Sequence, residues 1–247
     1  MTRLLLLHGF SGGPRSFSPV VRRLSSRFEI VAPALVGHAG SNAGPEIATF
    51  DAEVERLAAL MAGGPPAHLA GYSLGARLGL ALLTRFPGRF ARATLIGVHP
   101  GLRDERERAS RRASDARWCD VLESRGIEAF VAAWQAEPLF ASQARLPESL
   151  LRAQTAERLA HSPAGLARSL RVTGLAEMPD LYPELGRVGS DVTLLAGELD
   201  QKFLGLAREL CERLPRCRLR VAQGSGHNLL LEDPDLVTES ISEGMEP

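Results

Sequence analysis

Lysine is almost absent from this sequence. Lys202 is the single lysine among 29 basic residues, and all the others are arginines. An excess of charge of either sign is also missing, because 29 acidic residues bring the formal net charge to zero. Such a chain has no global field to attract nucleic acid or an anionic membrane surface. The composition therefore favours a small molecule as the partner.

Cysteines and long apolar runs are scarce as well. Cys119, Cys211 and Cys217 form an odd and sparse set, without the spacing of a zinc site or of a disulfide framework. No apolar run approaches the ~20 residues of a membrane span. The run Leu4–Leu7 is too short for the core of a signal peptide. These absences predict a cytoplasmic protein without membrane contact, and the sequence does not reveal its oligomeric state.

Six short apolar runs are present instead, with helical stretches between them. This alternation is typical of a parallel sheet built from βαβ units, whose strands are buried on both faces. With 247 residues, 45% of them hydrophobic, the chain can bury a large core. The expected strands are Arg3–Leu7, Phe28–Val31, Ala67–Ala70, Thr94–Val98, Val192–Ala196 and Arg218–Val221, and the expected helices among them are Pro14–Leu24, Thr49–Met61, Leu74–Phe86 and Leu204–Leu214.

The fourth and fifth runs are roughly ninety residues apart, whereas a simple crossover uses about thirty. This spacing predicts a helical cap in residues 101–185 and an α/β core in residues 1–100 and 186–247. The cap is expected over the carboxyl ends of the strands, where open α/β sheets bind their ligands. Its expected helices are Asp104–Ser124, Ile127–Gln135, Pro147–Leu159 and Ala164–Val172.

Ser73 lies between two glycines, in Gly71-Tyr72-Ser73-Leu74-Gly75, after an expected strand and before an expected helix. This is the context of a nucleophile elbow, a turn so tight that side chains at both glycine positions would collide with neighbouring backbone. The elbow predicts an α/β-hydrolase fold of about six mostly parallel strands flanked by helices, with the cap inserted after the fourth strand.

A serine hydroxyl needs an imidazole to take its proton and a carboxylate to orient that imidazole. In this fold the acid and the histidine follow the serine in that order. Asp200 follows the fifth expected strand and His227 follows the sixth, so Ser73, Asp200 and His227 are the expected triad. Glu198 competes with Asp200, but Asp200 lies nearer the tip of its loop.

Of the other histidines, His8 precedes the expected oxyanion loop, and its side chain is expected to be structural. The backbone amides of Phe10 and Leu74 are the expected oxyanion donors. His38 lies in Gly37-His38-Ala39-Gly40, a loop after the second expected strand, while His68 and His161 are expected to be ordinary residues, partly buried or on the surface. None of these three histidines is expected to have a catalytic role.

Arg77 follows Ser73 by four residues, so both side chains leave the same face of the helix. A guanidinium there favours a carboxylate-bearing substrate, and a salt bridge to the cap is the alternative. Lys202, two residues after Asp200, is expected to add a second cation at the mouth of the same pocket. The six arginines of Arg103–Arg117 alternate with acidic residues and are expected mostly to face solvent.

Several motifs together resemble one family of this fold, the 2-succinyl-6-hydroxy-2,4-cyclohexadiene-1-carboxylate synthases of menaquinone biosynthesis. The resemblance covers nearly the whole chain. The motifs are the elbow with Tyr72 and Arg77, His99-Pro100-Gly101-Leu102, Ser114-Asp115-Ala116-Arg117-Trp118, Phe130-Val131-Ala132-Ala133-Trp134, Pro138-Leu139-Phe140-Ala141-Ser142, Gly197–Phe203 and Gly226-His227-Asn228.

This resemblance implies a lyase that eliminates pyruvate from 2-succinyl-5-enolpyruvyl-6-hydroxy-3-cyclohexene-1-carboxylate, a small polycarboxylate. It implies that the triad acts as a base without an acyl-enzyme, and that Tyr72, Arg77, Arg111, Trp134, Arg158 and Lys202 bind the substrate. No cofactor is needed for this chemistry, and no metal-ligand spacing is present in the sequence.

Two positions depart from the family pattern. Gln135 stands where a tyrosine can follow the cap tryptophan, and the second cap arginine can be aligned with Arg158 or, less well, with Arg152. Two other functions use the same fold. An esterase, thioesterase or C–C bond hydrolase needs the triad but not the cations, and a non-catalytic ligand-binding protein needs only the pocket.

Overall fold

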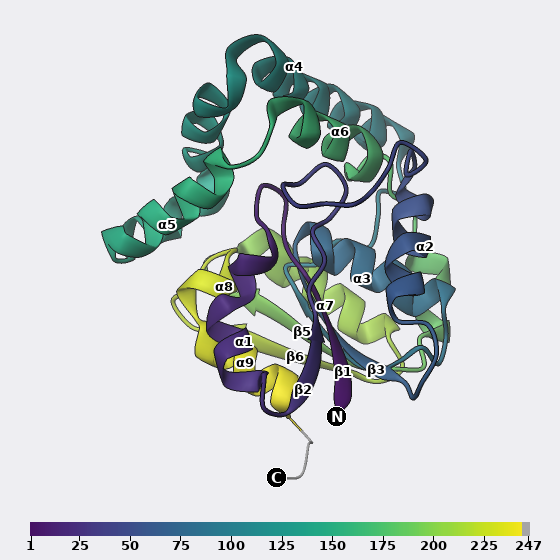
Figure 1. The fold of residues 1–247 in the computed structure, drawn as a ribbon. Coiled ribbons are helices and arrows are strands. Elements are labelled where there is room, and N and C mark those ends of the chain that lie inside the picture. Colours follow the sequence, from purple (N-terminus) through teal and green to yellow (C-terminus); the bar gives the residue numbers. More distant parts are fainter. Residues whose placement is uncertain (244–247) are drawn as a thin grey trace.

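The computed structural model describes residues 1–243, and a six-stranded parallel sheet forms its centre (Figure 1). The strand order is β2-β1-β3-β4-β5-β6, and each neighbouring pair is parallel. All six expected strands are confirmed. Their bounds are Thr2–Leu7 (β1), Phe28–Val31 (β2), Ala67–Tyr72 (β3), Phe90–Ile96 (β4), Asp191–Gly197 (β5) and Cys217–Ala222 (β6).

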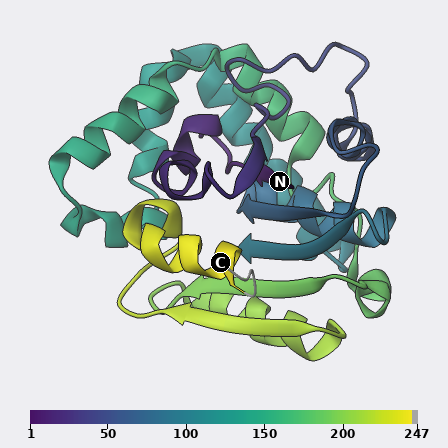
Figure 2. The same ribbon diagram turned by 60° about the horizontal axis from the view of Figure 1, so that its bottom comes forward.

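Helices cover both faces of this sheet (Figure 2). Alternate residues of a strand point to opposite faces, so Leu4 and Leu6 of β1 pack with α1 and α9, whereas Leu5 and Leu7 pack with α2, α3 and α7. The inner strands are largely apolar because both of their faces are buried, whereas the edge strands β2 and β6 carry charged residues and are only partly buried. The bounds are Ser18–Leu24 (α1), Phe50–Leu60 (α2), Leu74–Arg85 (α3), Gln201–Arg213 (α7), Leu229–Glu232 (α8) and Pro234–Ser242 (α9), with 3-10 turns at Pro14–Phe17 (η1) and Tyr182–Arg187 (η3).

The segment between β4 and β5 forms α4 (Glu105–Gln135), η2 (Pro138–Arg145), α5 (Glu148–Leu159) and α6 (Pro163–Thr173). These helices lie together beyond the carboxyl ends of the strands (Figure 1). α4 contains both helices expected in its range, and they meet at a kink at Gly126, where φ is 81°. The division of the chain into core and cap stays a prediction, and "cap" here denotes α4 to α6.

Two expectations from the sequence were wrong. β4 ends at Ile96 and not at Val98, because Gly97 turns the chain at φ 60°. The cysteines were expected to form no disulfide, yet Cys211 and Cys217 form one. Cys211 lies in the last turns of α7 and Cys217 begins β6, so the reversal between these elements brings the two together. Cys119 is free and buried. Within residues 1–243, no helix combines the length and the apolar character that a membrane crossing requires.

Candidate active site

Ser73 occupies the turn between β3 and α3, in a backbone conformation of φ 52° and ψ −105°. A non-glycine residue held there costs roughly 1–3 kcal/mol, which the surrounding structure must offset. The two flanking glycines permit the turn. A Cβ at Gly71 would lie 2.5 Å from the Gly75 oxygen, and one at Gly75 would lie 1.9 Å from the Leu7 oxygen. The Gly-x-Ser-x-Gly pattern is therefore a steric requirement of this turn.

His227 links this serine to Asp200. The imidazole Nε2 lies 3.1 Å from Ser73 Oγ, and Nδ1 lies 2.7 Å from Asp200 Oδ2. His227 and Asp200 are both buried. His227 lies in the loop after β6, and Asp200 lies in the loop after β5. With the Nδ1 proton donated to the carboxylate, Nε2 is free to accept the hydroxyl proton. This geometry activates the Ser73 hydroxyl, because His227 can accept its proton.

The competing carboxylate, Glu198, has a different partner. Its Oε2 accepts a hydrogen bond of 2.7 Å from the backbone amide of Gly224, so it fixes the loop before His227. Asp200 additionally caps α7, where its Oδ1 accepts from the Phe203 amide. Of the two carboxylates, the structure thus brings Asp200 to the imidazole.

The two expected oxyanion amides belong to segments that meet at the elbow. Leu74 is the first residue of α3, where amides point out of the helix and the helix dipole favours negative charge. The close approach of Gly75 to Leu7 and His8 brings the end of β1, and the loop with Phe10, against the elbow. Within residues 1–243 neither the Phe10 nor the Leu74 amide donates a hydrogen bond. Both remain available to a ligand.

A pocket of about 1150 Å³ opens above Ser73, between the carboxyl end of the sheet and the cap. It is larger than the roughly 300–1,000 Å³ of ordinary ligand sites. Ser73 and His227 are among its lining residues, whereas Asp200 lies behind them. Every substrate-binding residue expected from the sequence also lines it, namely Tyr72, Arg77, Arg111, Trp134, Arg158 and Lys202.

Arg77 and Arg111 form a pair of neighbouring cations in this pocket. Arg77 donates to the Thr173 carbonyl at 2.9 Å and has no acidic partner within residues 1–243, which excludes the expected alternative of a salt bridge to the cap. Arg111 pairs with Asp115 at 2.9 Å. Burial, and after it the charge of Arg111, lower the pKa of Arg77 to about 9 against the opposing effect of Asp115. Arg77 is therefore still charged at neutral pH.

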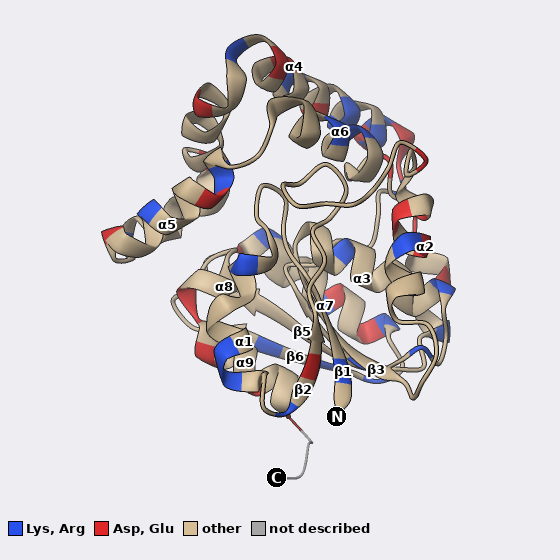
Figure 3. Cartoon of the chain, viewed as in Figure 1, with Lys and Arg blue, Asp and Glu red and all other residues tan. Residues whose placement is uncertain are grey.

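Arg158 and Arg152, the two candidates for the second cap arginine, differ in exposure. Arg158 is 4% exposed, lies over the Phe140 ring at 5.0 Å, and has a pKa that burial lowers to about 10. Arg152 is exposed and pairs with Glu148. The structure thus places Arg158 in the pocket and Arg152 outside it. Along the first half of α4, basic and acidic residues alternate on the outer surface, as expected (Figure 3).

Aromatic side chains form the wall on the cap side. Trp134 packs edge-on against Phe10 at 5.3 Å and stacks on Phe130 at 5.7 Å. Its indole Nε1 is buried without a hydrogen-bond partner among the described residues. Gln135, which departs from the family pattern, donates to Thr155 at 2.7 Å and so joins α4 to α5.

Two findings about the histidines did not follow from the sequence. His68 and His161 are buried, at 9% and 4% exposure, so the expectation of partly buried or surface residues was wrong. His38, in the loop after β2, is buried as well, at 4% exposure. His99 lines the pocket, and burial together with Lys202, Arg77 and Arg111 lowers its pKa to about 4. The sequence offered two signals for His99, its position just after β4 and its place in the motif His99-Pro100-Gly101-Leu102.

The buried histidines predict acid sensitivity. Burial lowers the pKa of His8 from 6.5 to about 4, so below pH 6.5 the unfolded chain binds a proton that the folded chain does not. The free energy of unfolding should fall by about 1.4 kcal/mol per pH unit for each such group between pH 6.5 and 4. Urea unfolding at pH 6.5, 6 and 5.5, above the range of the carboxylates, measures this slope. A free energy of unfolding that stays constant over these values would contradict it.

Comparisons with known proteins agree with this fold. Together these features define an alpha/beta hydrolase, and the sequence profile of the Alpha/beta hydrolase family matches residues 4–240. A 2-succinyl-6-hydroxy-2,4-cyclohexadiene-1-carboxylate synthase of Salmonella paratyphi A is 35% identical over 245 residues, which cover 97% of this chain and 92% of that protein. The chain belongs to the alpha/beta hydrolase family and, within it, to the family of these synthases.

Other relatives resemble the chain in part or in fold. A putative synthase of the same name from Bacillus subtilis is 35% identical over 175 residues, which cover 71% of this chain and 64% of that protein. The structure of MenH from S. aureus superposes with a TM-score of 0.92 at 28% identity, over 97% of this chain and 91% of the other. A thermophilic esterase from Thermogutta terrifontis has a TM-score of 0.82 at 22% identity, over 98% and 89% of the chains, and shows the fold alone.

Proposed function

We propose that this protein eliminates pyruvate from 2-succinyl-5-enolpyruvyl-6-hydroxy-3-cyclohexene-1-carboxylate and forms 2-succinyl-6-hydroxy-2,4-cyclohexadiene-1-carboxylate, a step of menaquinone biosynthesis. The observation that carries the proposal is a hydrogen-bonded Ser73–His227–Asp200 triad that opens into a pocket with buried cations. The names of the relatives support the same reaction. A cytoplasmic location stays a prediction from the sequence.

The reaction begins with the proton on the ring carbon that bears the succinyl group. This proton is acidic because the neighbouring ketone accepts the electron pair as an enolate. Ser73 takes the proton while His227 Nε2 takes the hydroxyl proton, so the imidazole ends the step protonated and paired with Asp200. No bond between Ser73 and the substrate is formed.

The second half of the reaction breaks the C–O bond to the enolpyruvyl group. The enolate electron pair returns through the ring, two conjugated double bonds result, and the enolpyruvyl oxygen leaves. Protonation of the departing group gives pyruvate, and the His227 imidazolium is the proton source at hand. The Phe10 and Leu74 amides stabilise the oxyanion that develops on the succinyl ketone.

Three carboxylates on the substrate account for the cations. Arg77 and Arg111 lie side by side, Arg158 lies near Tyr72, and Lys202 is near His99. A guanidinium binds a carboxylate with two parallel hydrogen bonds, and burial makes such a bond stronger than it is in water. A neutral ester has no carboxylate that these cations could bind.

The proposal is tested by supplying this substrate to the purified protein and following pyruvate with a coupled dehydrogenase. Arg77→Ala should raise KM about 10- to 100-fold with little change in kcat, because it removes a charged hydrogen bond made in the ground state as well as in the transition state. Arg85→Ala is the matched control, since Arg85 lies at the far end of the same helix and pairs with Asp51 on the surface.

Rapid hydrolysis of neutral short-chain esters that Arg77→Ala leaves unchanged would contradict the proposal and favour an esterase. Turnover retained in a Ser73→Ala protein would favour a protein in which the triad has no catalytic function.

A further inference from the structure

Three buried histidines from separate parts of the chain cluster around the oxyanion loop, defined here as residues 9–12. His8 and His38 meet edge to face at 4.7 Å between ring centroids, and His38 and His161 do so at 5.2 Å. His8 follows β1, His38 belongs to the loop after β2, and His161 lies between α5 and α6 of the cap. The triad uses none of the three.

Each of these imidazoles accepts a backbone N–H. His38 Nε2 accepts from the Ser11 amide at 3.1 Å, His8 Nε2 from Leu35 at 3.1 Å, and His161 Nδ1 from Ala39 at 2.9 Å. The other ring nitrogens of His38 and His8 face the carbonyls of Val36 and Gly9. Every acceptor nitrogen must therefore be unprotonated.

The pKa values of these three histidines are lowered, so their rings stay neutral at neutral pH and can accept hydrogen bonds. Burial lowers the pKa of His38 well below 6.5, and His8 and His161 lower it further. Burial also lowers the pKa of His161, although the Ser11 and Gly12 carbonyls beside it oppose this shift. The cluster is thus a set of neutral acceptors.

The backbone of Ser11 has an unusual conformation. Apart from Ser73, it is the one non-glycine residue with positive φ in the described chain, at 59°. Its own hydroxyl is buried without a partner, so the side chain does not hold this conformation. Strained backbone of this kind persists only where the surroundings fix it. The hydrogen bond from the Ser11 amide to His38 supplies that constraint, one residue away from Phe10.

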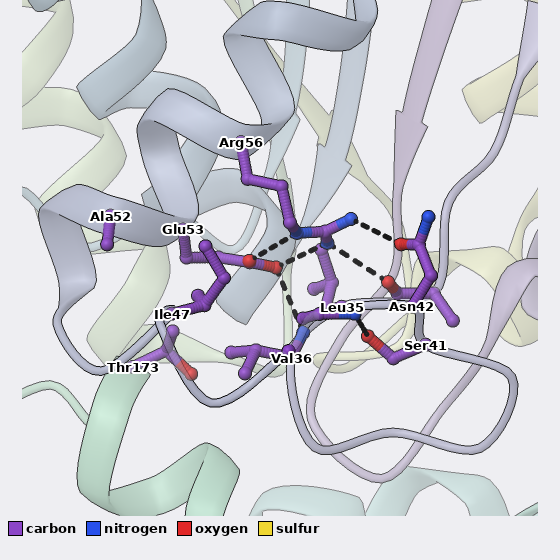
Figure 4. Close-up of polar contacts among 12 residues, drawn as sticks. Leu35, Val36, Ser41, Asn42, Ile47, Ala52, Glu53, Arg56 and Thr173 are labelled. Atoms are coloured by element: carbon purple, nitrogen blue, oxygen red, sulfur yellow. Dashed lines mark hydrogen bonds and ion pairs between the residues drawn. The ribbon is translucent and has the colours of Figure 1, made fainter.

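The loop that carries His38 is itself anchored. Glu53, which is fully buried, accepts from the Val36 amide at 2.9 Å. Arg56 binds Glu53 and donates to the Ala34 carbonyl and to Asn42, both at 3.1 Å (Figure 4). α2 therefore holds His38 on a rigid support, and His161 touches the same loop from the cap side.

We propose that His38, supported by His161, is a positioning residue that sets the Phe10 amide in the oxyanion hole and links this hole to the cap. The contacts run from His161 through Ala39 and His38 to Ser11, the neighbour of Phe10. The assignment rests on the proposed function in so far as the Phe10 amide stabilises the developing enolate. An amide displaced there costs transition-state stabilisation, while substrate binding depends on the cations elsewhere in the pocket.

The test compares His38→Ala, His38→Gln and His68→Ala in the pyruvate assay. His38→Ala should lower kcat about 10- to 100-fold and leave KM within about threefold, as expected when an oxyanion donor is misplaced. Glutamine can place an amide oxygen near the position of Nε2 and should restore most of kcat. His68 is the control, because it is also a buried histidine but packs on Phe28 at the opposite end of the sheet.

Circular dichroism and thermal unfolding establish that each variant is folded. If His38→Ala does not fold, His161→Ala takes its place, with a smaller loss of kcat expected. Wild-type kcat in the folded alanine variant, a rise of KM alone, or no rescue by glutamine would overturn the proposal. These outcomes differ from a failure of the proposed function, in which the wild-type protein itself releases no pyruvate.

Discussion

Replacing Ser73 by alanine should lower kcat about 10³- to 10⁴-fold and leave substrate binding nearly unchanged. In the proposed mechanism the Ser73 hydroxyl takes the substrate proton, and a positioned base contributes a factor of this order. His227 Nε2 is 3.1 Å from Ser73 Oγ, so without the hydroxyl the imidazole lies one atom too far from the substrate. Steady-state pyruvate release gives kcat, and equilibrium dialysis with the inactive variant gives the affinity.

Ser124→Ala is the matched control for this substitution. Ser124 is an exposed serine of α4 that donates to a backbone carbonyl within its own helix, and it lies outside the pocket. Its kcat should equal that of the wild type. A Ser73→Ala protein that keeps more than a tenth of the wild-type kcat would show that the serine is not the base.

Replacing Asp200 by asparagine should cost about 10³- to 10⁴-fold in kcat, although the two side chains have the same shape. The carboxylate accepts the Nδ1 proton of His227 at 2.7 Å, whereas an amide can turn its NH₂ toward this nitrogen and stabilise the wrong tautomer. The imidazole would then present a proton to Ser73 and could not accept one. Pyruvate release measures the loss.

Glu198→Gln provides the comparison, because both carboxylates belong to the same loop. Glu198 accepts from the Gly224 amide, and a glutamine oxygen can keep this bond, so kcat should fall by no more than a few-fold. Equal losses in the two variants, or a larger loss in Glu198→Gln, would reverse the assignment of the acid.

The sheet and the elbow could be predicted from the sequence because local patterns determine them. The inner strands of a parallel sheet are buried on both faces and are therefore apolar runs, and the tight turn at Ser73 requires glycine on either side. The chain order of acid and histidine placed Asp200 and His227, since the loops after parallel strands meet at one edge of the sheet.

Features that depend on tertiary contact could not be predicted in this way. His38 and His161 are 123 positions apart and meet only after the cap has folded onto the loop beyond β2. The choice between Arg152 and Arg158 depends on which face of α5 is turned inward, and this helix has no strong apolar stripe. The Cys211–Cys217 disulfide depends on the reversal between α7 and β6.

The most direct measurement is the reaction of the purified protein with substrate that carries deuterium on the ring carbon bearing the succinyl group. Elimination must break this C–D bond, so we predict one pyruvate per substrate consumed and a diene product without deuterium at that carbon. Consumption of the substrate without pyruvate release, or deuterium kept on that carbon, would contradict elimination by removal of this proton. The same release of pyruvate by the Ser73→Ala protein as by the wild type would contradict proton removal by the Ser73–His227–Asp200 triad.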